Sequence, residues 1–116
     1  LYLGGSWDLL RLKNQWAGED SVSMLDVSVL NDTILSSILG IEDSRTDQRI
    51  DFIGGSRGTE AIEHVVNSGS MAVGFTLFPT KMSELMAVAD AGLIMPPKST
   101  WFEPKLADGL LSLVLE

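Results

Sequence analysis

The stretch from Leu85 to Lys105 reads LMAVADAGLIMPPKSTWFEPK and carries three local signals in succession. It begins with an apolar helical run that Gly92 is expected to end, because glycine readily adopts the positive φ found just after a helix. Pro96-Pro97 prevents the helix from continuing, since proline lacks an N–H group and has a fixed φ. Lys98-Ser99-Thr100 and two aromatic residues follow. The stretch therefore predicts a helix, a rigid polar turn and a strand.

The first forty residues predict a β-hairpin followed by an amphipathic helix. Gly4-Gly5 separates Leu1–Leu3 from Trp7–Lys13, and paired glycines favour the tight turn of a hairpin. Asp26 is expected to cap a helix that ends at Gly40. The apolar side chains of this helix recur with the α-helical period, at Val27, Leu30, Ile34 and Ile38.

The middle of the chain predicts a strand–helix–strand unit. Short apolar runs indicate strands over Ile50–Ile53 and Met71–Phe78, and the helix between them opens at Gly58 and ends at Gly69. In a unit of this kind the two strands are parallel and the crossover is right-handed.

One more helix and two more strands are predicted in the last third. The helix runs from Pro79-Thr80 to Gly92, and strands follow over Thr100–Glu103 and Leu110–Leu115. The predicted fold class is α+β (α/β-like): three helices on a mixed sheet of about five strands, in the order ββαβαβαββ, with one right-handed βαβ unit. The last helix is expected to face inward with Met82, Leu85, Met86 and Ala89. The predicted core comprises Ile34, Ile38, Ile62, Val66, Phe75, Leu77, Leu85 and Met86.

Length, composition and charge exclude several classes of protein. With 116 residues, 45% of them apolar, the chain is interpreted as a single domain over residues 1–116. A formal net charge of −8 repels phosphate backbones, so no nucleic-acid partner is expected. The chain has no cysteine and no apolar run of membrane-spanning length, so a cytoplasmic protein that binds no membrane is predicted. Because it opens on Leu1-Tyr2-Leu3 without a methionine, it is expected to be an excised C-terminal fragment.

A glycine-rich loop, Gly54 to Gly58, is the first candidate binding site. It follows a predicted strand and precedes a helix, so the backbone N–H groups of Gly55 and Ser56 could face an anion while Arg57 pairs with it. The loop matches neither the P-loop nor the dinucleotide-binding pattern. A tight turn that needs positive φ is the favoured explanation of these glycines.

The second candidate site is the turn at Pro96-Pro97, which presents Lys98, Ser99 and Thr100. Two prolines reduce the entropy lost on binding, which favours a preorganised site. The alternative explanation, held as equal, is that the prolines only stop the helix and the two hydroxyls satisfy local backbone groups. The residues leave a binding site and a scaffold as open alternatives.

No catalytic or metal site is predicted. His64 is the single histidine and points away from the apolar face of its helix, so we expect it to be solvent-exposed. One histidine without cysteine provides neither a Ser–His–Asp triad nor a zinc site, and no cofactor is expected in this fragment. The acidic residues Glu42, Asp43, Asp47 and Asp51 lack the spacing of a calcium loop and are interpreted as a solvated connector.

Three stretches of the sequence resemble one known family. They are Leu85–Lys105, Leu25–Leu30 together with Ile38–Ile41, and Ile50–Gly55. They are similar to the C-terminal part of the bacterial and archaeal family called domain of unknown function 1015. Relatives in that family are several times longer. The resemblance implies an upstream Asp-Gly-His-His-Arg motif like that of ParB-type nucleotide-dependent folds, which include a free-serine kinase. It also implies that the genes of the family often lie next to genes of serine biosynthesis. That motif is absent from this sequence.

Two functions of different classes remain open. The first is a non-catalytic structural or ligand-positioning C-terminal domain, whose partner is the missing N-terminal part of the same protein. The alternative is a contribution to a small-molecule site, for a phosphorylated metabolite or nucleotide, in a ParB-like kinase or an enzyme of serine metabolism with its catalytic motif upstream. On either interpretation the fragment alone is not expected to be an enzyme. A small anionic metabolite is the expected ligand.

Overall fold

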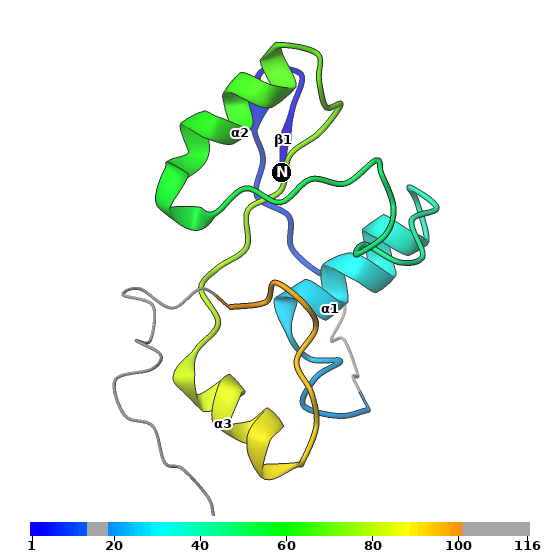
Figure 1. Cartoon of the computed structure of the whole chain (residues 1–116), viewed down its shortest axis with the longest axis vertical. Helices are drawn as coiled ribbons and strands as arrows, with labels where there is room; N and C mark the ends of the chain where they lie inside the picture. The colour runs from blue at the N-terminus through cyan, green and yellow to red at the C-terminus, as the bar shows by residue number, and fades with distance from the viewer. Residues whose placement is uncertain (14–18, 101–116) are drawn as a thin grey trace, which may run out of the picture.

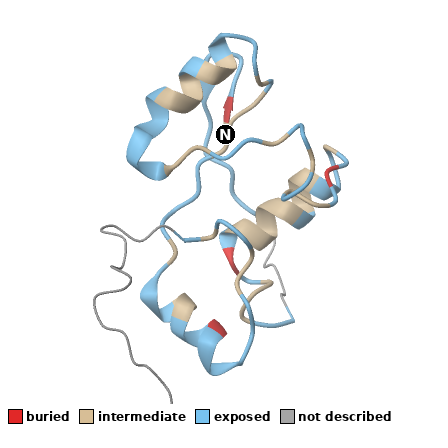
Figure 2. Ribbon diagram, viewed as in Figure 1, coloured by how far each residue is buried: buried red, intermediate tan, exposed pale blue. Residues whose placement is uncertain are grey.

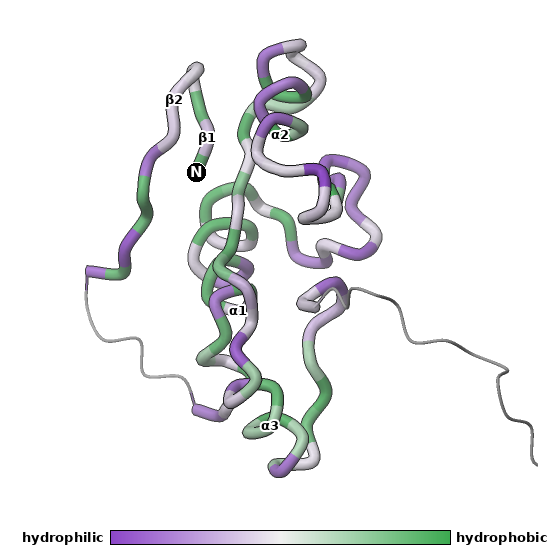
Figure 3. Tube along the Cα trace, turned by 90° about the vertical axis from the view of Figure 1, so that its left-hand side faces the viewer, coloured by the Kyte–Doolittle hydropathy of each residue, from purple (hydrophilic) through white to green (hydrophobic). Residues whose placement is uncertain are grey.

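The computed structural model describes residues 1–13 and 19–100, which form a small α+β arrangement (Figure 1). A two-stranded hairpin lies at one end and α3 at the other (Figures 1 and 3). The elements in order are β1 (Tyr2–Leu3), β2 (Ser6–Trp7), α1 (Asp26–Leu30), the π-helix η1 (Asn31–Ser36), the 3-10 helix η2 (Gly55–Arg57), α2 (Gly58–Asn67) and α3 (Met82–Asp90). None of the described helices is long and apolar enough to cross a membrane.

The predicted hairpin is present but shorter than expected. β1 and β2 are antiparallel, with Tyr2 opposite Trp7 and Leu3 opposite Ser6. The two residues between them, Gly4 and Gly5, have φ values of 59° and 85°. Positive φ at both central residues matches the right-handed twist of the strands, which is why glycine is required at this turn.

The hairpin is held against α2 and the chain that follows α2. Tyr2 and Gly74 exchange two backbone hydrogen bonds, of 2.7 and 3.0 Å, and the Tyr2 hydroxyl donates to Asn67 Oδ1 at 3.1 Å. Trp7 Nε1 donates to Glu63 Oε1 at 2.8 Å. Only glycine fits at position 74, because a Cβ there would lie 2.1 Å from Ile62 Cγ2. This close approach places residues 71–75 directly on α2.

The first predicted helix changes type halfway along its length. Asp26 is its first residue and Leu25 takes the N-cap position, so the prediction of Asp26 as the cap is wrong. After Leu30 the backbone continues as the π-helix η1, and Gly40 follows with a φ of 63°, as expected beyond a helix end. A π-helix takes about one more residue per turn than an α-helix, so the apolar stripe loses its phase. Ile38, which belongs to the predicted stripe, is exposed.

The predicted mixed sheet is wrong. Among the described residues β1 and β2 are the only strands, and the single further ladder contact joins Tyr2 to Gly74. Neither 50–53 nor 71–78 forms a strand, so there is no parallel βαβ unit. In the first of these segments the Phe52 N–H donates to Asp51 Oδ1 at 2.7 Å, a local bond that competes with strand pairing. The predicted strand over 110–115, and all but Thr100 of the one over 100–103, lie outside the described residues.

Without a sheet as a second layer, the core is small (Figure 2). The buried hydrophobic residues in the described part are Tyr2, Leu25, Ile41 and Val88. None of the eight predicted core residues is among them. Ile34, Ile62, Val66, Phe75 and Leu85 are half-buried, whereas Ile38, Leu77 and Met86 are exposed. A helix buries its apolar side only against a second element, which the missing sheet would have supplied.

The last described helix is shorter than predicted, because it begins at Met82 and not at Pro79-Thr80, and its inward side differs from the prediction. α3 begins at Met82, and Glu84 Oε2 accepts a hydrogen bond from the Lys81 N–H at 2.8 Å, which satisfies one of the free donors at the helix start. Gly92 follows the helix with a φ of 66°, as predicted. Val88 is the buried residue, while Met82, Met86 and Ala89 are exposed.

Candidate functional site

A groove of about 760 Å³ lies among the described residues. Its walls come from α1 and η1, the connector that follows them, α2, the chain between α2 and α3, and the turn at 96–98. Figure 3 shows mainly hydrophobic colour along α1 and along the chain between α2 and α3. The volume lies within the range of roughly 300–1,000 Å³ typical of small-molecule sites.

The turn at one edge of the groove holds Lys98 in a constrained conformation. Lys98 has a φ of 61° and is the one non-glycine residue in the described ranges with a positive φ. Ser99 Oγ donates a hydrogen bond to Pro96 O, and Thr80 Oγ1 donates to Ser99 O at 3.1 Å. A left-handed conformation costs a residue with a Cβ on the order of 1–3 kcal/mol, and such positions cluster at functional sites.

The glycine-rich loop is explained largely as a turn. Gly54 has an extended conformation, and Gly55–Arg57 forms the short 3-10 helix η2 before α2. Gly58 has a φ of 71° and a ψ of −179°, a combination that is essentially restricted to glycine. The favoured explanation of this loop, a tight turn with positive φ, therefore holds at Gly58.

The predicted site residues separate into three groups. Lys98 and Gly55, distant in sequence, line the same groove. Arg57 instead lines a second hollow, which it shares with His64 and Asp51, so the structure does not bring the two predicted cations into one cavity. Ser56, Ser99 and Thr100 line neither of the two hollows. His64 is exposed, as predicted.

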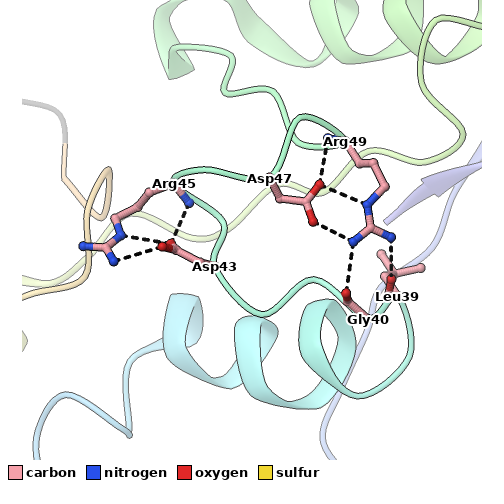
Figure 4. A network of polar contacts seen from close by, with 6 residues as sticks. All are labelled: Leu39, Gly40, Asp43, Arg45, Asp47 and Arg49. Atoms are coloured by element: carbon pink, nitrogen blue, oxygen red, sulfur yellow. Dashed lines mark hydrogen bonds and ion pairs between the residues drawn. The ribbon is translucent and has the colours of Figure 1, made fainter.

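Two Asp–Arg pairs lie in the connector at 43–49 (Figure 4). From the sequence, this acidic connector is interpreted only as solvated, and the pairs are not predicted. Asp43 accepts from Arg45 at 2.9 and 3.0 Å, and Asp47 accepts from Arg49 at 3.0 and 2.6 Å. Arg49 also donates to the carbonyls of Leu39 and Gly40, at 3.2 and 3.0 Å. Arg49 thus ties the connector to the end of the first helix. The repeated Asp-x-Arg spacing at 43–45 and 47–49 is the signal that could have revealed these pairs.

The network lowers the pKa of both carboxyl groups. Hydrogen bonds from the Arg45 side chain and backbone lower the pKa of Asp43 to about 2. Arg49 acts in the same way on Asp47 and also lowers its pKa to about 2. In each pair the arginine favours the ionised carboxylate.

These pKa values predict a loss of stability in acid. A carboxyl group whose pKa is lower in the folded than in the unfolded protein stabilises the fold above its unfolded pKa of 3.8. This contribution is lost as the pH falls towards about 2. As the pH falls from 3.8 to about 2, we expect the urea midpoint of the unmodified protein to decrease more steeply than the urea midpoint of the double variant Asp43→Asn/Asp47→Asn. Parallel curves for the two proteins would contradict the prediction.

The described residues include no group of three or more His, Asp or Glu side chains arranged to hold a metal ion. Comparison with known proteins adds no further assignment, since no protein-family model, curated protein or solved structure matches the chain. The resemblance to the domain of unknown function 1015 family therefore stays a prediction.

Proposed function

We propose that this chain is a non-catalytic, ligand-positioning domain whose groove binds a small molecule with an apolar body and one anionic group. The observation that carries the proposal is that Lys98, held at positive φ, lines the same groove as Gly55 and the apolar residues of α1 and α2. Apolar walls with a few polar groups are the usual composition of a small-molecule site.

The charges around the groove favour Lys98 as the anion-binding group. Arg45 and Arg49 also line it, but their guanidinium groups are bonded to Asp43 and Asp47. Lys98 forms no ion pair with any of the residues in 1–13 and 19–100. Within the described part of the chain its ammonium group is therefore available to a carboxylate or phosphate, while the arginines are engaged in holding the connector.

The same proposal accounts for the absence of a catalytic constellation in the sequence. We assign the domain to a cytoplasmic protein in which the N-terminal part supplies any chemistry and this groove orients a small anionic metabolite. A contribution to a nucleotide-dependent enzyme of serine metabolism rests on the family resemblance alone.

Binding of phenyl phosphate tests this function, with phenol as the matched ligand that lacks the anion. We expect phenyl phosphate to raise the melting temperature more than phenol does, because only the folded groove binds it. Lys98→Met keeps the apolar stem without the charge and should weaken phenyl phosphate binding by about tenfold or more in calorimetry, the usual effect of losing a charge-assisted hydrogen bond.

Arg57→Gln is the matched control, because Arg57 lines the second hollow and is not among the residues that line the groove. It should leave the affinity for phenyl phosphate unchanged. Equal affinity of the parent and Lys98→Met, or no binding by the parent, would contradict the proposal.

A further inference from the structure

The second hollow, which has a volume of about 450 Å³, lies against one side of α2. Its lining is formed by the chain before η2 and by residues of η2 and α2: Asp51, Ile53, Arg57, Ala61, His64 and Val65. On α2, positions 61, 64 and 65 have the i, i+3 and i+4 spacing of one helix face. The volume lies within the range that is typical of small-molecule sites.

The lining of this hollow has an apolar inner part and a charged outer part. Ile53, Ala61 and Val65 are half-buried, whereas the three polar side chains are exposed. Apolar walls with a few polar groups at the opening are the usual composition of a site that orients a small ligand.

Asp51 and Arg57 bring opposite charges to the hollow without neutralising each other. No ion pair joins them to each other or to any other residue in the described ranges. Within those ranges the Arg57 guanidinium makes no hydrogen bond either. Asp51 Oδ1 accepts a hydrogen bond from the Phe52 N–H at 2.7 Å, and Oδ2 has no partner among the same residues. One cation and one anion therefore face the hollow, both available to a ligand.

These two charges favour a ligand that carries both signs. A ligand with negative charge alone is attracted by Arg57 and repelled by Asp51, and a purely cationic ligand meets the reverse. A molecule with a carboxylate beside an ammonium group satisfies both, because a guanidinium binds a carboxylate through two parallel N–H bonds and a carboxylate accepts from an ammonium. The repulsion of ligands with only one sign adds to the specificity. An α-amino acid combines the two charged groups with a side chain that can enter the inner part.

We propose that the second hollow binds a free α-amino acid with an apolar side chain. Arg57 binds its carboxylate, Asp51 accepts hydrogen bonds from its ammonium group, and the half-buried residues contact its side chain. His64 supplies a further N–H donor at the same opening. The proposal does not rest on the function proposed for the groove, although Asp51, Ile53 and Val65 line both.

Calorimetric titration of the whole chain with L-leucine tests the proposal, with two analogues as matched ligands. N-acetyl-L-leucine keeps the carboxylate and the side chain but lacks the ammonium charge, and L-leucinamide keeps the ammonium group but lacks the carboxylate. We expect each analogue to bind about tenfold or more weakly than leucine, the usual effect of losing a charge-assisted hydrogen bond. Equal affinity of leucine and either analogue, or no binding of leucine, would overturn the proposal.

Two variants at exposed positions assign the two charges. Arg57→Gln should weaken the binding of leucine by about tenfold or more, but should not weaken the binding of leucinamide, which lacks the group that Arg57 binds. Asp51→Asn should weaken the binding of leucine to a similar extent, but not the binding of N-acetyl-leucine. Unchanged affinity for leucine in both variants would contradict the proposal.

Lys98→Met is the control for the location of the site, because Lys98 lines the groove and not the second hollow. It should leave the affinity for leucine unchanged. Weaker binding of leucine by Lys98→Met than by Arg57→Gln would place the amino acid in the groove and overturn the proposal.

Discussion

Gly74→Ala should lower the free energy of unfolding by about 3 kcal/mol, the upper end of what overpacking usually costs. The added Cβ would lie 2.1 Å from Ile62 Cγ2, a contact that requires the chain after α2 to move away from that helix. Ile62 cannot relieve it by a small rotation, because its branched Cβ restricts χ1 in a helix. The same movement would strain the two hydrogen bonds between Gly74 and Tyr2. Urea denaturation measures the loss.

Two further variants separate this steric effect from a general intolerance of alanine. Gly55→Ala is the matched control, because a Cβ there meets nothing within 4 Å and its φ is not positive. It should change the free energy of unfolding by no more than about 1 kcal/mol. Ile62→Ala removes the clashing methyl group, so Gly74→Ala should cost clearly less in that background. A Gly74→Ala protein as stable as the parent would show that residues 71–75 do not lie on α2.

Leu25→Ala should also destabilise the protein by about 3 kcal/mol, within the usual range for a buried leucine. Leu25 is 3% exposed and occupies the N-cap position of α1, so its truncation removes apolar contacts from a core with few buried side chains. A loss of that size is a large share of the stability of a small domain. Thermal and urea unfolding measure it.

Met24 provides the control for Leu25 from the neighbouring position. It is 55% exposed, so Met24→Ala should change the free energy of unfolding by at most about 0.5 kcal/mol. Similar losses for the two variants would mean that Leu25 is not part of the core.

Three members of the Asp–Arg pairs, Asp43, Arg45 and Arg49, line the same groove as Lys98, although they come from the opposite half of the chain. The connector at 43–49 fixes the end of the first helix through Arg49, and Thr80 fixes the turn at 96–99. Two parts of the groove lining are therefore held by polar contacts. For the ligand groove that we propose, such contacts favour a site that is formed before its ligand arrives, which reduces the entropy lost on binding.

Local signals in the sequence by themselves determined where helices and turns lie. Gly4-Gly5 forms the hairpin turn, and Gly40, Gly69 and Gly92 each follow a helix with positive φ, as predicted. These signals succeed because they depend on the conformational freedom of one residue and its immediate neighbours. The exposure of His64 could be predicted for the same reason, from the period of a single helix.

Only the tertiary structure decided what those elements pack against. The apolar runs at 50–53 and 71–78 have the composition of strands, but a strand exists only with a hydrogen-bonded neighbour, and the described residues supply one ladder contact, at Gly74. The presence of Lys98 and Gly55 in the lining of one groove likewise depends on the packing of segments far apart in the chain. Local sequence carries no register between distant segments, so these contacts are settled only when the whole chain packs.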